Sequence, residues 1–158
     1  MQYFNIQSPV RTLDDVDWHI LNELQHDARL TYAEIGRRVG LSSPAVAERV
    51  HRLEEAGIIT GYSARVDVTR LGLPLVAIIR VRYPGERYKQ IHKMVEECPA
   101  VLMCDHVTGD DCLIIRVATA TTAELEQLIG QFGSYGQTTT SMVLSSPVTE
   151  RIIDRRDC

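Results

Sequence analysis

The stretch TYAEIGRRVGLSSPAVAERVHRL, residues 31–53, carries the signals of two short helices joined by a tight turn. Thr31, followed three residues later by Glu34, is a capping box, in which each side chain accepts from the backbone N–H of the other residue at the start of a helix. Gly40 follows the last apolar residue of that helix and suits a left-handed C-terminal cap. The two segments predict a helix-turn-helix.

The second helix of the pair is the candidate recognition helix. Ser42 or Ser43 caps it, Pro44 fits its first turn, and Gly57 ends it. At about 100° per residue, one face of this helix is apolar and points inward, and it consists of Val46, Val50 and Leu53. The outward residues are Pro44, Glu48, His51 and Arg52, with small residues at Ser43, Ala45 and Ala47 that allow close approach to a groove. Arg49 lies near the buried edge and is expected to reach a phosphate.

Two further segments complete the predicted N-terminal domain. Residues 13–25 have apolar positions at helical spacing and aspartates in the first turn, where the helix dipole favours negative charge. Residues 58–62 and 63–67 predict a two-stranded wing. Residues 13–66 are therefore predicted to form a winged helix-turn-helix with three helices.

The charge pattern fits a specific DNA-binding protein better than one that coats nucleic acid. The chain has a net charge of −4, whereas five arginines and two glutamates between Arg29 and Arg52 give 5 − 2 = +3. No apolar run approaches the ~18 residues of a membrane span. The N-terminus lacks a secretory pattern, and the four cysteines form no C-x-x-C pair. These features predict a cytoplasmic protein with reduced thiols, no metal and no membrane partner.

The second half alternates strand and helix patterns in the order βαββαβ, which is typical of a ferredoxin-like fold. The predicted elements are strand 75–82, helix 87–97, strand 101–107, strand 112–118, helix 122–132 and strand 138–144. The fold class is therefore α+β. The predicted divisions are an N-terminal extension at 1–12, the winged domain at 13–66, a linker or hinge strand at 67–74, the ferredoxin-like domain at 75–148 and a tail at 149–158.

One face of the predicted sheet lacks a cover within a single chain. The two helices carry apolar stripes that cover one face, which leaves apolar strand positions such as Val76, Ile78 and Ile114 on the other. An exposed apolar face of this size marks an interface. A two-fold dimer through it would set two recognition helices about one DNA turn apart on a pseudo-palindromic site.

The N-terminal residues, in one collinear match of about fifty positions, resemble the leucine-responsive regulator (Lrp/AsnC) family. The match includes Leu13-Asp14, Asp17, Ile20-Leu21, Asp27-Ala28-Arg29, Val39-Gly40-Leu41-Ser42, Arg49-Val50, Arg52-Leu53-Glu54 and Gly57-Ile58-Ile59, and the resemblance extends to about Pro147. It implies a regulator of amino-acid metabolism genes that forms dimers and larger rings, often octamers. The DNA contacts that it implies are Thr31, Arg38, Ser42, Ser43, Pro44, Ala45, Glu48, Arg49 and Arg52.

The resemblance also implies an effector site in the second half. By itself the loop Val107–Cys112 is typical of a hairpin turn, but in the family this loop lies between dimers and helps to hold the effector. The expected effector-binding residues are Thr108, Gly109, Asp110, Asp111, Gly136, Gln137, Thr138 and Thr140. The aspartates would accept from an amino-acid ammonium, while backbone N–H groups and threonine hydroxyls would donate to its carboxylate. Many members have Asp and an aromatic residue where this chain has Cys112 and Leu113.

Three other functions compete with this interpretation. An enzyme is disfavoured because the sequence offers no nucleophile–base set, no phosphate loop and no catalytic residue. A metal- or redox-sensing regulator would use cysteines such as Cys98, Cys104 and Cys112, although small buried thiols in a sheet explain them more simply. An architectural protein that wraps DNA without a ligand would keep the same recognition helix and dimer.

Overall fold

The computed structural model describes residues 12–155, which divide into two compact units. One unit contains the chain up to Ala64 together with the segment that starts at Val148, and the other is Arg65–Pro147. Apart from Thr12, the predicted N-terminal extension lies outside the described residues, as do the last three residues of the predicted tail.

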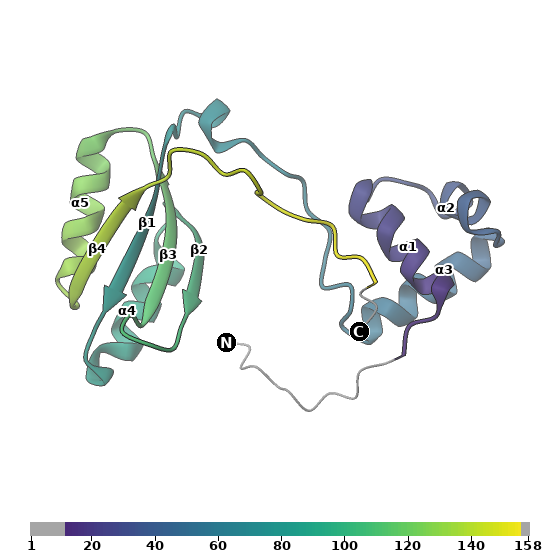
Figure 1. Cartoon of the computed structure of the whole chain (residues 1–158), viewed down its shortest axis with the longest axis horizontal. Helices are drawn as coiled ribbons and strands as arrows, with labels where there is room; N and C mark the ends of the chain where they lie inside the picture. Colours follow the sequence, from purple (N-terminus) through teal and green to yellow (C-terminus); the bar gives the residue numbers. More distant parts are fainter. Residues whose placement is uncertain (1–11, 156–158) are drawn as a thin grey trace. The chain divides into compact units, whose positions relative to one another are not determined.

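The first unit contains three helices, α1 (Asp15–His26), α2 (Tyr32–Val39) and α3 (Ser43–Glu55) (Figure 1). Each helix starts with a side-chain cap, from Asp14, Thr31 and Ser42 respectively. The predicted capping box of α2 is confirmed, because Thr31 N donates to Glu34 Oε2 at 2.8 Å and Glu34 N donates to Thr31 Oγ1 at 3.2 Å. The predicted helix-turn-helix is therefore present.

Apolar side chains from all three helices form the core of this unit. The buried members are Ile20, Leu21, Leu24, Ile35, Val46, Val50 and Leu53, so the inward face predicted for α3 is confirmed. The turn between α2 and α3 uses Gly40 at φ 73°, where a glycine avoids the strain of a left-handed conformation. At Gly36 any Cβ would lie 2.4 Å from the carbonyl oxygen of Leu41, so the turn packs directly on α2.

The predicted wing is wrong, because no strand forms between α3 and β1 (Leu75–Arg82) (Figure 1). The backbone N–H groups of Ile58 and Ile59 both donate to Leu53 O, at 2.9 and 3.1 Å, which holds this stretch on the end of α3. The following residues 60–67 are exposed, and the Tyr62 hydroxyl donates to Glu54 at 2.9 Å. An isolated two-stranded ribbon is marginally stable, and here α3 supplies the hydrogen-bond acceptors instead.

The predicted hinge strand at 67–74 is also replaced by a different local structure. Val68–Leu71 forms a 3-10 helix. The Asp67 side chain accepts from both the backbone N–H and the hydroxyl of Thr69, at 3.0 and 2.6 Å, and Gly72 ends the turn at φ 83°. Local side-chain bonds of this kind compete with extended structure.

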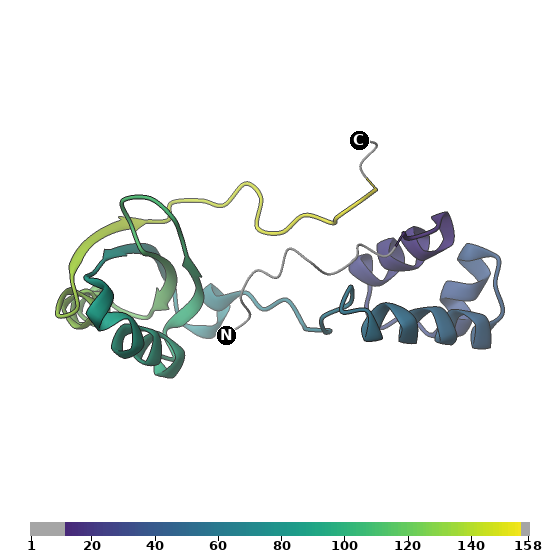
Figure 2. The ribbon, with the colours of Figure 1, turned by 90° about the horizontal axis from the view of Figure 1, so that it is seen from below.

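The second unit has the predicted βαββαβ order. Its elements are β1 (Leu75–Arg82), α4 (Tyr88–Glu97), β2 (Val101–His106), β3 (Leu113–Thr119), α5 (Thr122–Gly133) and β4 (Gln137–Met142), with a short 3-10 turn at Gly85–Arg87. The four strands form one antiparallel, visibly curved sheet in the order β2-β3-β1-β4 (Figure 2). The ferredoxin-like arrangement is therefore confirmed.

One face of the sheet packs against α4 and α5. Its core joins alternate residues of β1 and β3 to helix residues, namely Ala77, Ile79, Val81, Leu113, Ile115 and Val117 with Ile91, Leu125, Leu128 and Phe132. On the opposite face Val76, Ile78 and Ile114 stay partly exposed. This face also carries the exposed Arg80 and Arg82, so it is less apolar than the strand pattern predicts.

The chain after Val148 packs on α1 of the first unit. The Gln25 side-chain amide donates to Ile153 O at 3.0 Å and accepts from Ile153 N at 2.9 Å, so it satisfies both backbone groups of one residue. Arg155 forms an ion pair with Asp15. Part of the predicted tail thus belongs to the helix-turn-helix unit. None of the helices within residues 12–155 is long and apolar enough to cross a bilayer.

Candidate nucleic-acid interface

The outer face of α3 combines exposure with small and polar side chains. Val46, Val50 and Leu53 are at most 1% exposed, which fixes the opposite side of the helix outward. The predicted DNA-contacting residues Ser42, Ser43, Pro44 and Glu48 are exposed there, and Ala45 and Arg52 are partly exposed. Ser42 Oγ accepts from Ala45 N at 3.4 Å, and Val46 N donates to Ser42 O at 3.0 Å. Because Pro44 has no N–H, the Ser43 N–H is the first-turn group left to donate to a phosphate.

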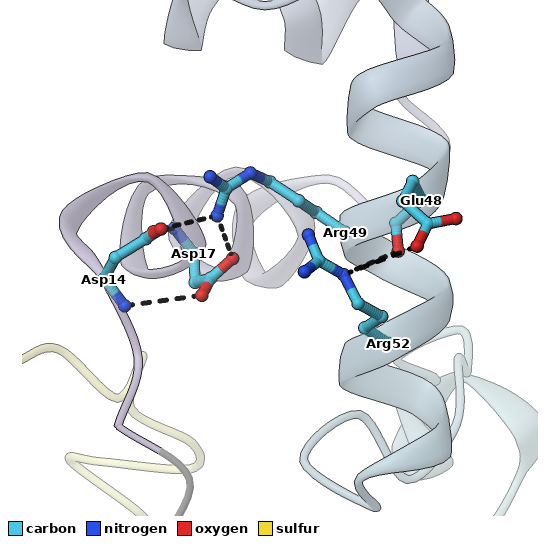
Figure 3. Close-up of polar contacts among 5 residues, drawn as sticks. All are labelled: Asp14, Asp17, Glu48, Arg49 and Arg52. Carbon is cyan, nitrogen blue, oxygen red and sulfur yellow. Dashed lines mark hydrogen bonds and ion pairs between the residues drawn. The ribbon is translucent and has the colours of Figure 1, made fainter.

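Arg52 extends along the surface of α3 toward Glu48 (Figure 3). Its Nε lies 3.7 Å from Glu48 Oε1 and donates to Glu48 O at 3.4 Å. Both side chains are well exposed, at 40% for Arg52 and 69% for Glu48, so solvent weakens their attraction. The contact with Glu48 is therefore a weak competitor to a base edge or a phosphate.

Arg49 points away from this outer face, toward the first turn of α1 (Figure 3). Its Nη1 donates to Asp14 Oδ2 and to Asp17 Oδ1, each at 2.7 Å. The Asp17 N–H and then the Arg49 guanidinium lower the pKa of Asp14, and the two carboxylates raise the pKa of Arg49. The phosphate contact predicted for Arg49 remains a prediction, and the structure gives this side chain partners inside the protein.

The two predicted contacts on α2 also have partners within the unit. Arg38 forms an ion pair with Glu23 of α1, although the Arg38 side chain is 51% exposed. The Thr31 hydroxyl donates to Glu34 Oε2 at 2.7 Å, and this hydrogen bond lowers the pKa of Glu34. Both residues therefore help to build the helix pair on which the outer face of α3 depends.

Sequence reasoning missed three features of this region. It assigned Asp14 and Asp17 only to the helix dipole, although both accept from Arg49. It gave no role to Gly36, whose missing side chain admits the turn. It left out Arg37, which is exposed beside Arg38 in the last turn of α2. No local sequence pattern predicts that a carboxylate of α1 pairs with an arginine of α3. The two adjacent arginines Arg37 and Arg38, in contrast, can be recognised in the sequence as a basic pair.

The two predicted effector loops lie at the same end of the sheet. Val81, near the end of β1, is paired with Leu113 at the start of β3 and with Thr138 at the start of β4. The loop before β3 and the loop before β4 therefore flank the same end of β1. A Cβ at Gly136 would lie 2.1 Å from Arg82 O, so only glycine permits this approach.

The individual effector candidates differ in exposure and partners. Thr108, Gly109, Asp110 and Gln137 are exposed, and Gly109 has φ 118°. Asp111 lies 3.6 Å from Arg80 of β1, an arginine that sequence reasoning did not include. Thr138 is partly buried, and the buried Thr140 Oγ1 has no hydrogen-bond partner.

Two open hollows of this unit lie elsewhere. One, of about 370 Å³, is lined by residues that include Leu73, Ala118 and Gln131, and the other, of about 510 Å³, lies between α4 and α5. None of the predicted effector residues lines either hollow. Neither of these two hollows is therefore the predicted effector site.

The metal- and redox-sensing alternative gains no support from the described residues. No group of three histidine, cysteine or acidic side chains in this part of the chain is arranged to hold a metal ion. Cys98, Cys104 and Cys112 are free thiols. Burial raises the pKa of Cys104 to about 11, which keeps it a poorly reactive thiol.

Both halves of the chain match known family models. The AsnC-type helix-turn-helix domain matches residues 13–54, and the Lrp/AsnC ligand binding domain matches residues 76–153. The chain belongs to the Lrp/AsnC family. Like other Lrp/AsnC proteins, it is a transcription regulator that joins a DNA-binding helix-turn-helix domain to a ligand-binding domain.

Relatives and solved structures agree with this membership of the Lrp/AsnC family. The HTH-type transcriptional regulator LrpC of Bacillus subtilis is 33% identical over 133 residues, which cover 84% of this chain and 92% of LrpC. The proline dehydrogenase transcriptional activator of Rhodobacter capsulatus is 37% identical over 122 residues, 75% of this chain and 79% of the activator. The crystal structure of the transcriptional regulator NMB0573 of Neisseria meningitidis, in complex with L-Met, has a TM-score of 0.84 at 27% identity and covers 90% of this chain and 96% of that one.

Proposed function

We propose that this regulator binds a pseudo-palindromic DNA site as a dimer or larger ring, controls genes of amino-acid metabolism in the cytoplasm, and responds to a small amino acid. The observation that carries the proposal is the exposed outer face of α3, which the buried Val46, Val50 and Leu53 orient. Its proposed DNA contacts are Ser42, Ser43, Pro44, Ala45, Glu48 and Arg52, with Thr31 and Arg38 on α2.

Dimerisation through the uncovered face of the sheet is part of this proposal. Val76, Ile78 and Ile114 are only partly buried in one chain, and a second copy would cover them. Arg80 and Arg82 on the same face need acceptors in the dimer, because an unpaired buried charge is costly. Asp111, beside Arg80, supplies one such acceptor. Measurement of the molecular mass in solution tests this step, and a monomer at micromolar concentration contradicts it.

The amino-acid response is supported by the L-Met complex of the NMB0573 structure, and the link to amino-acid metabolism by the regulator of proline dehydrogenase. In this chain the loop that contains Gly109 and Asp110 and the start of β4 with Thr138 flank the same end of β1. Since the two hollows of this unit are lined by other residues, we propose that a second dimer completes the site. An octamer is one ring that would do so.

The decisive experiment selects DNA sites from a random pool with the purified full chain and repeats the selection with each of the twenty amino acids. We expect a pseudo-palindrome and a change in affinity with at least one amino acid. Arg52→Ala should weaken binding by about 1–3 kcal/mol if the guanidinium reads a base edge. Equal affinity of the selected duplex and bulk competitor DNA contradicts the proposal.

A ligand-independent architectural role is the second candidate. It is favoured by the absence of predicted effector residues from the two hollows of the ligand-binding unit. The variant Asp110→Ala separates the two roles: a ligand-responsive regulator should change its response or its ring size while dimer affinity for DNA stays the same. No amino-acid response in the wild type, with weak sequence preference and a steep salt dependence, favours the architectural role.

A further inference from the structure

Arg49 contacts both residues that cap α1. Asp17 N donates to Asp14 Oδ1 at 2.8 Å and Asp14 N donates to Asp17 Oδ2 at 3.3 Å, which is the capping box of α1. The second oxygen of each carboxylate accepts from Arg49 Nη1 at 2.7 Å. Every carboxylate oxygen of the cap is therefore used, and one arginine joins α3 to the start of α1 (Figure 3).

Burial makes this contact specific. The Asp17 side chain is only 8% exposed and the Arg49 side chain 23%, whereas the Arg52–Glu48 pair on the same helix lies in solvent. A nearly buried carboxylate requires a partner, so the α1 cap selects the orientation of α3 in which Arg49 meets it. The hydrophobic driving force on the apolar core is non-directional, so the contact of Arg49 adds a directional constraint to it.

The local charge disfavours a phosphate at Arg49. One guanidinium and two carboxylates sum to 1 − 2 = −1 at this point. A phosphate that approached Arg49 would meet two negative groups at hydrogen-bond distance from the same nitrogen. We propose that Arg49 is a positioning residue, which holds the recognition helix on the capped end of α1 through Asp14 and Asp17, and that it does not bind DNA phosphate.

This inference rests on the proposed DNA binding by α3. The variant Asp17→Asn tests the positioning role of Arg49, because this role and a phosphate-binding role predict opposite changes in DNA affinity. Removal of a negative charge from a DNA-binding unit raises its affinity for DNA if charge alone matters. If Asp17 and Arg49 position α3, the same change should lower affinity about tenfold, the size of a lost contact to DNA. Asp15→Asn is the matched control, since Asp15 lies on the same turn, is 80% exposed and contacts Arg155 instead of Arg49.

The measurement is fluorescence anisotropy of the selected duplex with the full chain, over a salt series and below the thermal transition of each variant. We expect Arg49→Lys to lose affinity as Asp17→Asn does, because the lysine ammonium keeps the charge but ends one bond short of the Nη1 position that contacts both carboxylates. We expect the salt slope to stay that of the wild type in Arg49→Ala, whereas loss of a phosphate contact lowers it by about one. The double variant with Asp17→Asn and Arg49→Ala should bind no more weakly than either single variant.

The outcomes separate this inference from the proposed function. Wild-type protein that does not discriminate the selected duplex overturns both. Weaker binding by Arg52→Ala, together with unchanged or tighter binding by Asp17→Asn, overturns only the positioning role. A salt slope lowered by about one in Arg49→Ala also overturns it. Should Asp17→Asn unfold at the assay temperature, the comparison of Arg49→Lys with Arg49→Ala decides, because a phosphate contact predicts that lysine restores binding.

Discussion

The two units of this chain orient their elements by different means. In the helix-turn-helix unit, polar contacts cross between helices: Arg49 of α3 with the cap of α1, and Arg38 of α2 with Glu23 of α1. In the sheet unit, backbone ladders fix the strands and a continuous apolar layer holds α4 and α5. Backbone hydrogen bonds between strands fix the register of a sheet directly. Short helices on a small core have no such bonds between them, so directional side-chain contacts are needed to set their orientation.

The two units should therefore tolerate different substitutions. The sheet unit should depend mainly on the volume of its core, because its register is already fixed by hydrogen bonds. The helix-turn-helix unit should depend on individual contacts and on close approaches such as that at Gly36. Trp18, the single tryptophan of the chain, packs against the core of the helix-turn-helix unit and so reports on that unit alone.

The largest expected effect comes from a cavity in the sheet unit. Phe132 is fully buried between α5 and the sheet, and Phe132→Ala should cost about 3–5 kcal/mol of unfolding free energy. Far-UV circular dichroism should show an early transition, while the fluorescence transition of Trp18 stays in place. Val50→Ala in α3 is the matched variant and should move the Trp18 transition instead. A common shift of both signals in both variants would mean that the units unfold together.

The next largest effect on stability is expected from replacing one of two helical glycines, and the comparison tests the role of close backbone packing at Gly36. Gly36→Ala should cost about 1–3 kcal/mol, because its Cβ would overlap the Leu41 carbonyl in a packed turn. Gly130→Ala in α5 is the control: its Cβ meets no atom within 4 Å, so it should stabilise the helix by about 0.5–1 kcal/mol. Chemical denaturation measures both. Equal stability of the two variants would contradict the comparison.

The smallest expected effect is a pH response confined to the sheet unit. His92 stacks on Tyr88 and meets His106 edge-on, with ring centroids 4.1 and 5.7 Å apart, and its Nε2 lies 3.4 Å from the Tyr83 hydroxyl. Burial, and then His106, lower the pKa of His92 below its ordinary value, while Glu96 opposes them. Protonation therefore occurs more readily in the unfolded chain. The stability that neutral His92 gives is complete above about pH 6.5 and is lost as pH falls through its lowered pKa.

Unfolding followed between pH 7 and 5 checks this response, with each unit monitored by its own signal. The lowered pKa values of Asp14 and Glu34 act only near and below the ordinary carboxyl range of about 4, so these two carboxyls should not move the Trp18 transition over this interval. His92→Phe should flatten the response of the sheet unit, whereas His19→Gln, an exposed site on α1, should not. An unchanged profile in His92→Phe would assign the response to another group.

Features that depend on near neighbours were predictable from the sequence. The capping box at Thr31 and Glu34, the left-handed Gly40 and the inward face of α3 involve residues at most a few positions apart. Strand alternation likewise predicted the βαββαβ order and the covered face of the sheet. Such signals are readable because helix ends and strand faces are set by local geometry.

Contacts between residues far apart in the sequence depend on how the helices and strands pack. Arg49 meets Asp14 and Asp17 from 35 and 32 positions away, and Gln25 binds Ile153 from 128 positions away. The predicted wing failed for the same reason, since the end of α3 competes for the backbone N–H groups of Ile58 and Ile59. A charged or amide side chain offers the same bonds to many partners, and packing selects among them.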